Sequence, residues 1–173
     1  MTYECRPCEL EIDFTSYVQF LIAHHAELNL PYSFAQKLSF VSSPLMFGKG
    51  LLIYEEELYR IVGAAGFVYG TGSHEYENRD VCQVETVFIE NDHRHPFLFV
   101  RAMQELVRLM KAGNPDVRQV QFWTSADAGE LDGLLAKFTA LPGAARSEVQ
   151  ALAYYQIPFH ELETFCGRFR DAR

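Results

Sequence analysis

Residues 84–110 read VETVFIENDHRHPFLFVRAMQELVRLM, and this segment tells most about the architecture. The apolar run VETVFIE predicts a strand over 81–90 that is buried on both faces in its second half. A helix is predicted over Pro96–Ala112, because proline suits the first helical position and the following apolar residues keep helical spacing. A strand, a tight loop and a helix in this order are a common anion site, because backbone N–H groups at a helix start point outward.

The rest of the chain alternates between helical and strand patterns. Changes of hydrophobic period and the glycine and proline positions set the expected boundaries. Strands are expected over 3–6, 51–55, 59–69, 117–124 and 151–157. Helices are expected over 13–28, with Asp13 as N-cap, over 33–41 and over 131–138, and the C-terminal segment looks partly helical. Gly63 and Gly66 fall inside a strand and predict a bulge or a close backbone approach.

The composition narrows the functional class. The chain has 173 residues with 49% hydrophobic content, which suggests one globular domain over 1–173. The net charge of −8 argues against a nucleic-acid-binding protein, because no excess of basic residues is available to neutralise phosphates. No apolar run is long enough to cross a membrane, and the polar N-terminus does not resemble a secretory signal. We therefore expect a cytoplasmic protein that binds neither nucleic acid nor membrane.

Four cysteines are present, and Cys5 and Cys8 form a C-x-x-C motif. A zinc site would need two further ligands at compatible spacing, and a redox site would need the motif at the start of a helix after a strand. His24 and His25 follow, but adjacent histidines on a helix point in different directions. Free thiols are the preferred interpretation.

The order strand, two helices, three strands, helix, strand, helix, strand resembles that of the GNAT superfamily of acyl-CoA-dependent N-acyltransferases. The resemblance covers nearly the whole chain by element order and is specific around Val84–Met110. It implies an α/β fold with a mixed, mostly antiparallel central sheet flanked by helices. It also implies acetyl-CoA or another acyl-CoA as cofactor and a small-molecule or peptide amine as acceptor, and it leaves a homodimer open.

The loop before the long helix departs from the pattern of this family. The family's loop has the form R/Q-x-x-G-x-G/A, and its N–H groups wrap the coenzyme A pyrophosphate. Alignment of Arg94 with the first loop position puts Phe97 and Phe99 where the small residues stand, and Pro96 lacks an N–H. We therefore expect weak pyrophosphate binding. The residues expected to contact the cofactor are Phe88, Ile89, Arg94, His95, Phe97, Leu98 and Phe99.

Arginines recur every seven residues in this region, at Arg94, Arg101 and Arg108. They suit either a 3′-phosphate or a solvated helix face, and the solvated face is preferred. Trp123, the single tryptophan, is expected in the core, although the gap between the strands at Phe88 and Trp123 would hold the pantetheine arm. We expect that strand 81–90 is central and that its C-terminal half diverges from strand 117–124. Phe88 or Ile89 would then line the gap.

Glu85 is the candidate general base, because a buried strand rarely carries a carboxylate and the family often places its base on this strand. An edge-facing or ion-paired Glu85 is the alternative. The family's general-acid tyrosine is replaced by Leu135 in this alignment, so Tyr154 or Tyr155 would have to substitute, and Tyr155 is the one we select. Two hypotheses remain, namely an N-acyltransferase and a non-catalytic relative that has lost coenzyme A binding.

Overall fold

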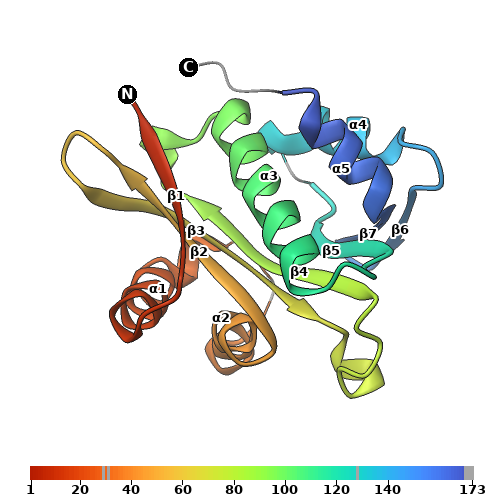
Figure 1. Cartoon of the computed structure of the whole chain (residues 1–173), viewed down its shortest axis with the longest axis horizontal. Helices are drawn as coiled ribbons and strands as arrows, with labels where there is room; N and C mark the ends of the chain where they lie inside the picture. The colour runs from red at the N-terminus through yellow and green to blue at the C-terminus, as the bar shows by residue number, and fades with distance from the viewer. Residues whose placement is uncertain (29, 31, 128, 170–173) are drawn as a thin grey trace.

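The computed structural model describes residues 1–28, 30, 32–127 and 129–169. Seven strands in this part of the chain form one sheet in the order β1-β2-β3-β4-β5-β7-β6 (Figure 1). Their bounds are β1 Tyr3–Pro7, β2 Gly48–Glu55, β3 Arg60–Tyr69, β4 Val81–Ile89, β5 Gln119–Ser125, β6 Ala145–Val149 and β7 Leu152–Pro158. β4 and β5 pair in parallel, and the other neighbours pair antiparallel. The expected mixed, mostly antiparallel sheet with a central β4 is confirmed.

Helices cover both faces of the sheet, as Figure 1 shows. One layer holds α1 (Glu11–Ala23) and α2 (Phe34–Phe47) against β2, β3 and β4. The opposite layer holds α3 (Pro96–Gly113), α4 (Asp132–Thr139) and α5 (Phe159–Gly167). Short 3₁₀ turns are η1 His25–Leu28, η2 Gly72–His74, η3 Asn91–His93 and η4 Gly129–Leu131. Each helical layer buries its own apolar cluster against the sheet.

The longest helix, α3, forms for the reason that the sequence indicates. Pro96 is its first residue. Val100, Met103, Val107 and Met110 are buried, the last three in the larger cluster. Helix α3 is therefore packed tightly against the sheet. This packing holds the loop before α3 close to the end of β4.

Several expected boundaries are wrong. Helix α1 starts at Glu11 and not after Asp13, because Asp13 sits in the first turn and its carboxylate accepts the N–H groups of Glu9 and Leu10 at 3.1 and 2.9 Å. Helix α2 continues to Phe47 through Pro44. Strand β6 was not expected, because all of its side chains are exposed and show no hydrophobic alternation.

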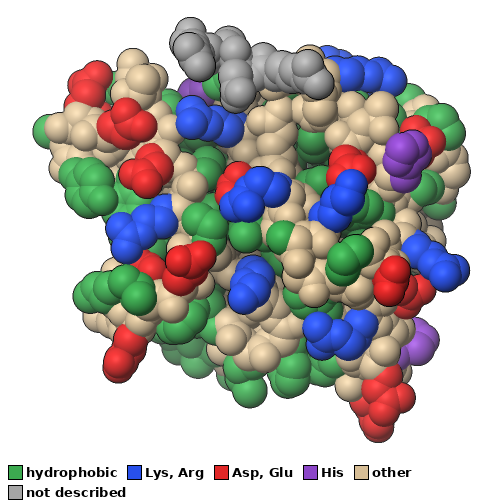
Figure 2. Space-filling view, viewed as in Figure 1, with side chains coloured by type: hydrophobic (Ala, Val, Ile, Leu, Met, Phe, Trp, Pro, Cys, Tyr) green, Lys and Arg blue, Asp and Glu red, His purple; other side chains and the backbone are tan. Residues whose placement is uncertain are grey.

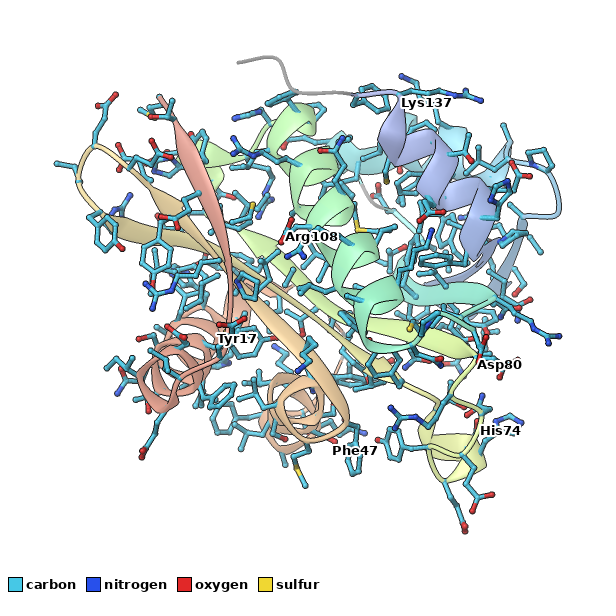
Figure 3. The ribbon with its side chains drawn as sticks, in the orientation of Figure 1. Tyr17, Phe47, His74, Asp80, Arg108 and Lys137 are labelled. Carbon is cyan, nitrogen blue, oxygen red and sulfur yellow. The ribbon has the colours of Figure 1, made fainter. Side chains whose placement is uncertain are left out.

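The two strand glycines behave as predicted. The β2–β3 register shifts beside Gly63, between Ile53 and Tyr54, and the β3–β4 register shifts between Gly66 and Phe67, so both glycines lie beside bulges. At Gly66, an added Cβ atom would lie 2.2 Å from the Tyr17 Oη atom and 2.8 Å from Pro44. Tyr17 reaches this position from α1 toward the sheet (Figure 3). Glycine at 66 is therefore what allows α1 and α2 to pack this closely onto β3.

Candidate functional site

Strands β4 and β5 separate halfway along their length. Their register runs from Val81–Gln119 to Val84–Phe122, after which β4 continues alone to Ile89 and β5 to Ser125. Beyond this point the β4 backbone groups on the β5 side have no β5 ladder partner. The predicted wedge-shaped gap between these two strands is confirmed.

A cavity of about 690 Å³ occupies this gap. It extends from the layer of α1 and α2, where Glu85 lines it, to the layer of α3 and α4, where Phe99 and Leu135 line it. Its wall is formed by Glu27, Leu28, Leu30, Val84–Ile89, Arg94–Pro96, Phe99, Met103, Phe122–Ser125, Asp127, Gly129–Leu131, Leu135 and Phe138. Residues of both helical layers therefore line one cavity at the point where the two strands separate.

A bulge in β4 sets the direction of the Glu85 side chain. Thr86 lies opposite Gly66 and Val84 lies opposite Phe67, so Glu85 is the extra residue. Glu85 and Thr86 consequently both reach α2, where Ser43 Oγ donates to Glu85 Oε1 at 3.4 Å and Thr86 Oγ1 donates to the Phe40 carbonyl at 3.4 Å. A bulge that turns a polar side chain in this way is frequent beside functional sites.

Burial raises the pKa of the Glu85 carboxyl group, and the hydrogen bonds from Gln83 and Ser43 lower it by less. Gln83 Nε2 donates to Glu85 Oε2 at 3.2 Å. No cationic side chain forms an ion pair with Glu85 among the described residues. The carboxylate thus faces a cavity, has one neutral donor on each oxygen and holds a proton more readily than an exposed glutamate does.

The start of α3 is capped from within the chain. His95 is the N-cap, and its Nδ1 atom accepts the Leu98 N–H at 3.2 Å. The His95 carbonyl oxygen accepts the Phe99 N–H at 3.3 Å. This second bond is the ordinary first bond of the helix. Of the four N–H groups that a helix start leaves without an intrahelical partner, the one of Leu98 is therefore occupied by His95 and the one of Pro96 does not exist. This end of α3 is poorly suited to hold a pyrophosphate.

The other expected cofactor residues divide into two groups. Phe88, Ile89 and Phe99 line the cavity, as do Arg94 and His95. Phe97 points away with 45% of its surface exposed, and Leu98 is fully buried in the core. The Phe99 ring therefore occupies part of the cavity, whereas the Phe97 ring lies outside the cavity.

The three regularly spaced arginines do not form one phosphate-binding face. Arg94 lies before the helix and donates from Nη2 and Nε to the Ile89 carbonyl oxygen at 3.0 and 3.3 Å. Arg101 is exposed. Arg108 is also exposed and pairs with Glu105, and Figure 3 shows it on the side of α3 toward β1. The face of the molecule in Figure 2 shows basic and acidic side chains interspersed, without a patch of one sign. Arg94 is thus the arginine that the structure brings to the cavity.

The structure separates the two neighbouring tyrosines. The Tyr155 ring stacks on Phe122 with centroids 4.9 Å apart, and its hydroxyl group accepts a hydrogen bond from Arg146 Nε at 3.0 Å. Tyr155 is 4% exposed, and Phe122 stands between it and the cavity, whose lining in the described chain contains no tyrosine. Leu135 does line the cavity. Tyr154 points to the opposite face, where its hydroxyl group donates to Gln121 Oε1 at 2.6 Å.

Trp123 is a correction to the sequence analysis. It is 37% exposed and lines the cavity, with its ring against that of Tyr154 at 4.5 Å between centroids. It lies beyond the last β4–β5 pair, so the neighbouring strand does not cover it. Sequence reasoning also passed over Gln83 and Gln121. The signal was present, because polar side chains alternate with apolar ones at Gln83 and Glu85 and at Gln119 and Gln121.

The C-x-x-C motif lies outside the cavity. Burial raises the pKa of the Cys5 thiol to about 11 and that of the Cys8 thiol to about 12. Both side chains are free thiols. The raised pKa values favour the protonated thiols near neutral pH, and no group of three or more possible metal ligands occurs among the residues that the structure describes.

No helix in the described part of the chain is long and apolar enough to cross a lipid bilayer. The sequence matches no protein-family model and no curated protein. Solved structures, in contrast, superpose over nearly the whole chain.

An acetyltransferase of the GNAT family from Staphylococcus aureus Mu50 has a TM-score of 0.61 and 12% identity over 90% of this chain and 99% of its own. The ribosomal-protein-S5-alanine acetyltransferase of Vibrio fischeri has a TM-score of 0.60 and 11% identity, over 90% and 91%. The yncA protein of Salmonella typhimurium, solved with its cofactor acetyl-CoA, has a TM-score of 0.59 and 11% identity, over 92% and 95%. This chain therefore has the GNAT acetyltransferase fold, and the resemblance predicted from its sequence is confirmed at the level of the fold.

Proposed function

We propose that this protein is an N-acyltransferase that moves an acyl group from a pantetheine thioester to an amine. The observation that carries the proposal is the position of Glu85, a partly buried carboxylate that a β-bulge turns into the cavity between the separated strands. Fold alone does not decide function, so the residues at the cavity have to supply the argument.

In this reaction an amide bond forms between the amine nitrogen and the acyl carbon, and the C–S bond of the thioester breaks. Glu85 takes the proton that the nitrogen loses, directly or through one water molecule. Burial favours the protonated form of Glu85, and this raises its ability to act as a base near neutral pH. Backbone groups of β4 beyond Val84 have no β5 partner, and they offer hydrogen bonds to the amide-containing pantetheine arm.

The fit to the acyl donor is uneven along its length. The apolar wall formed by Phe88, Ile89 and Phe99 suits a thin pantetheine chain. The pyrophosphate would lie at the N-terminus of α3, where His95 already occupies the Leu98 N–H and Pro96 has no N–H to donate. Arg94 is the cation that remains for a phosphate. We therefore propose that recognition of the donor depends on its pantetheine end more than on its nucleotide end.

The proton donor to the leaving thiolate is less well defined. Tyr155 is the candidate from the sequence, and it is a weak one, because Phe122 lies between its hydroxyl group and the cavity. A thiolate leaves without a strong acid, since an alkyl thiol ionises about two units above neutral pH. We therefore propose Glu85 as the principal catalytic residue.

A second candidate function is supported by one specific observation. The capped α3 N-terminus favours a relative that keeps the fold for binding without acyl transfer. A thiol-release assay with acetyl-CoA and S-acetyl-pantetheine against a panel of small amines and peptide N-termini separates the two functions. We expect release by the wild type and about 10²-fold less by Glu85→Gln, the usual size of an acid–base contribution.

The same samples need a folding control and a binding measurement. Far-UV circular dichroism should give the same spectrum for the wild type and Glu85→Gln, because Gln83 and Ser43 can also bond to an amide at position 85. Absence of thiol release, together with absence of binding of either thioester at millimolar concentration, would favour the non-catalytic relative.

A further inference from the structure

A row of hydrogen-bonded side chains runs across three strands and ends at Glu85. Gln121 Nε2 donates to Gln83 Oε1 at 2.8 Å, and Gln83 Nε2 donates to Glu85 Oε2 at 3.2 Å. At the other end, the Tyr154 hydroxyl group donates to Gln121 Oε1 at 2.6 Å. We name this row, Tyr154–Gln121–Gln83–Glu85, the amide ladder.

The strand register explains why these residues meet. Gln83 and Glu85 are two apart on β4 and share one face. Gln83 lies directly opposite Gln121 on β5. Tyr154 on β7 lies directly opposite Trp123, which is two residues after Gln121 on β5, so Tyr154 is the diagonal neighbour of Gln121. Side chains at such positions are close enough to bond. The ladder is therefore a consequence of the sheet topology and not of a flexible surface.

Alternating polar residues on a strand are more often a solvated face. Two facts argue against that interpretation here. Gln121 is only 8% exposed, and the three ladder distances lie between 2.6 and 3.2 Å. Buried amides that bond to each other in a fixed order are specific arrangements, because an unpaired amide would be costly in the same place.

The order of the donors follows from the carboxylate. An ionised Glu85 only accepts hydrogen bonds, so Gln83 must present its NH₂ group to Glu85 and its oxygen to Gln121. Gln121 must then present its NH₂ group to Gln83 and its oxygen to Tyr154. Each donor along the ladder points toward Glu85, and bonds in such a chain strengthen one another.

We infer that Gln83, Gln121 and Tyr154 are positioning residues, which fix the rotamer of Glu85 and favour its ionised form at the cavity. The catalytic part of this inference, that Glu85 acts as the base, rests on the proposed function. A glutamine does not pass protons readily, since that would require its amide to change tautomer. The ladder therefore orients Glu85 and stabilises its charge, but it is not a proton relay.

The chain offers a matched control within the same strand. Gln119 Nε2 also donates to Gln121 Oε1, at 3.1 Å, but Gln119 is a side branch that does not lie between Tyr154 and Glu85. Gln119→Met thus removes the same chemical group from the same face of β5 without interrupting the ladder. Gln83→Met and Gln121→Met interrupt it with side chains of similar volume.

The first readout is independent of activity. Carboxyl carbons of a ¹³C-glutamate-labelled protein are titrated by NMR, with Glu85→Gln used to assign the Glu85 signal. The titratable groups that face Glu85 are Tyr17 on α1, whose pKa is raised by burial and, to a smaller extent, by the Glu85 charge, and the groups that line the same cavity, namely Glu27, Arg94, His95, Asp127 and Glu130. Because the assignment isolates one carbon, titration of these groups does not obscure the result.

We expect Gln83→Met to move the Glu85 midpoint upward the most, because it removes a donor to the ionised form. Gln121→Met should move it upward less. Gln119→Met should move it least, because the shorter bond from the Tyr154 hydroxyl group, at 2.6 Å, still holds Gln121 Oε1 when the 3.1 Å bond from Gln119 is lost. In the thiol-release assay, Gln83→Met should lower kcat/KM about tenfold, the size of one hydrogen bond to a charged group, with the acidic limb of the pH profile displaced upward. Equal midpoints in Gln83→Met, Gln121→Met and Gln119→Met would overturn the inference.

A second pair of variants keeps the test valid if the methionine variants do not fold. Tyr154→Phe removes one oxygen and leaves the ring against Trp123, whereas Tyr155→Phe removes one oxygen on the other face of the sheet. A small upward shift of the Glu85 midpoint in Tyr154→Phe alone supports the ladder, and equal midpoints in both variants overturn it. Shifted midpoints without any thiol release would refute the proposed function but leave the ladder as a device that holds the Glu85 charge.

Discussion

The imidazole of His95 accepts the backbone N–H of Leu98 at 3.2 Å, so the loop that would receive a pyrophosphate in the proposed function caps its own helix. An N-cap of this kind stabilises the protein by about 1 kcal/mol. The same bond removes a donor from the place where the phosphates of coenzyme A would need it. Stability of α3 and affinity for a nucleotide therefore compete at one residue.

The first prediction concerns the two ends of the acyl donor. If the nucleotide end contributes little, acetyl-CoA and S-acetyl-pantetheine should bind with dissociation constants within about tenfold of each other. Each missing hydrogen bond to a charged group removes about 1.5–3 kcal/mol, so two of them place acetyl-CoA near the millimolar range. Isothermal titration of both thioesters, followed also by Trp123 fluorescence, measures the ratio directly.

Three variants identify the obstacle. Phe99→Gly should strengthen acetyl-CoA binding, because the Phe99 ring lines the cavity, while Phe97→Gly should not, because Phe97 is 45% exposed outside it. His95→Ala should gain affinity for acetyl-CoA but not for S-acetyl-pantetheine, at a cost of about 1 kcal/mol in stability. Micromolar binding of acetyl-CoA by the wild type, far tighter than that of the pantetheine thioester, would show that this account of the loop is wrong.

The second prediction uses the pH dependence of folding. Burial raises the pKa of Glu85 above its ordinary value of 4.5, so the folded state holds a proton that the unfolded state has already released. The free energy of unfolding contributed by Glu85 is thus fully present below pH 4.5 and falls as the pH rises toward the folded pKa.

Glu85→Gln removes this titration and leaves the other groups in place. Urea denaturation of both proteins between pH 4 and pH 8 should show the variant gaining stability relative to the wild type as the pH rises, with a plateau once Glu85 is ionised in the folded state. The opposite trend would mean that the Gln83 and Ser43 hydrogen bonds outweigh burial.

Sequence reasoning succeeded where short-range pattern and topology determine the outcome. The strand-loop-helix around Pro96 and the bulges beside Gly63 and Gly66 follow from local rules, whereas the divergence of the two strands follows from the resemblance to the GNAT superfamily. It failed at Trp123, because exposure depends on where the β4–β5 pairing ends. It missed the amide ladder for a similar reason, since the contact of Gln83 with Gln121 requires the parallel register, which one sequence does not specify.

The third prediction concerns Tyr155. If its hydroxyl group gave a proton to the leaving thiolate, Tyr155→Phe would lower kcat by about 10²-fold. Because Phe122 separates it from the cavity, we expect a loss of less than tenfold, with a small decrease in stability from the lost Arg146 hydrogen bond. Steady-state kinetics with S-acetyl-pantetheine, beside a urea denaturation curve, distinguish a catalytic from a structural role. A loss of kcat by two orders of magnitude in a fully folded variant would restore Tyr155 as the general acid.

The fourth prediction tests how α1 is fixed against the sheet. The Tyr17 hydroxyl group is fully buried, and no group in the described part of the chain forms a hydrogen bond with it. Tyr17→Phe should therefore be neutral or stabilising by about 1 kcal/mol, because it removes an unsatisfied polar atom. Gly66→Ala should lower the free energy of unfolding by about 1–3 kcal/mol, since its Cβ atom would lie 2.2 Å from that hydroxyl oxygen.

The double variant Gly66→Ala with Tyr17→Phe makes the test specific. If the hydroxyl oxygen is the obstacle, its removal should recover a large part of the loss, and the double-mutant cycle should show a coupling of about 0.5 kcal/mol or more. Pro44 also lies 2.8 Å from the added atom, so recovery should stay incomplete. Gly133→Ala is the matched control, because an added Cβ atom there meets nothing within 4 Å in helix α4 and should stabilise the protein by about 1 kcal/mol. Additive effects of the two changes in urea denaturation would show that Tyr17 does not contact Gly66 as described.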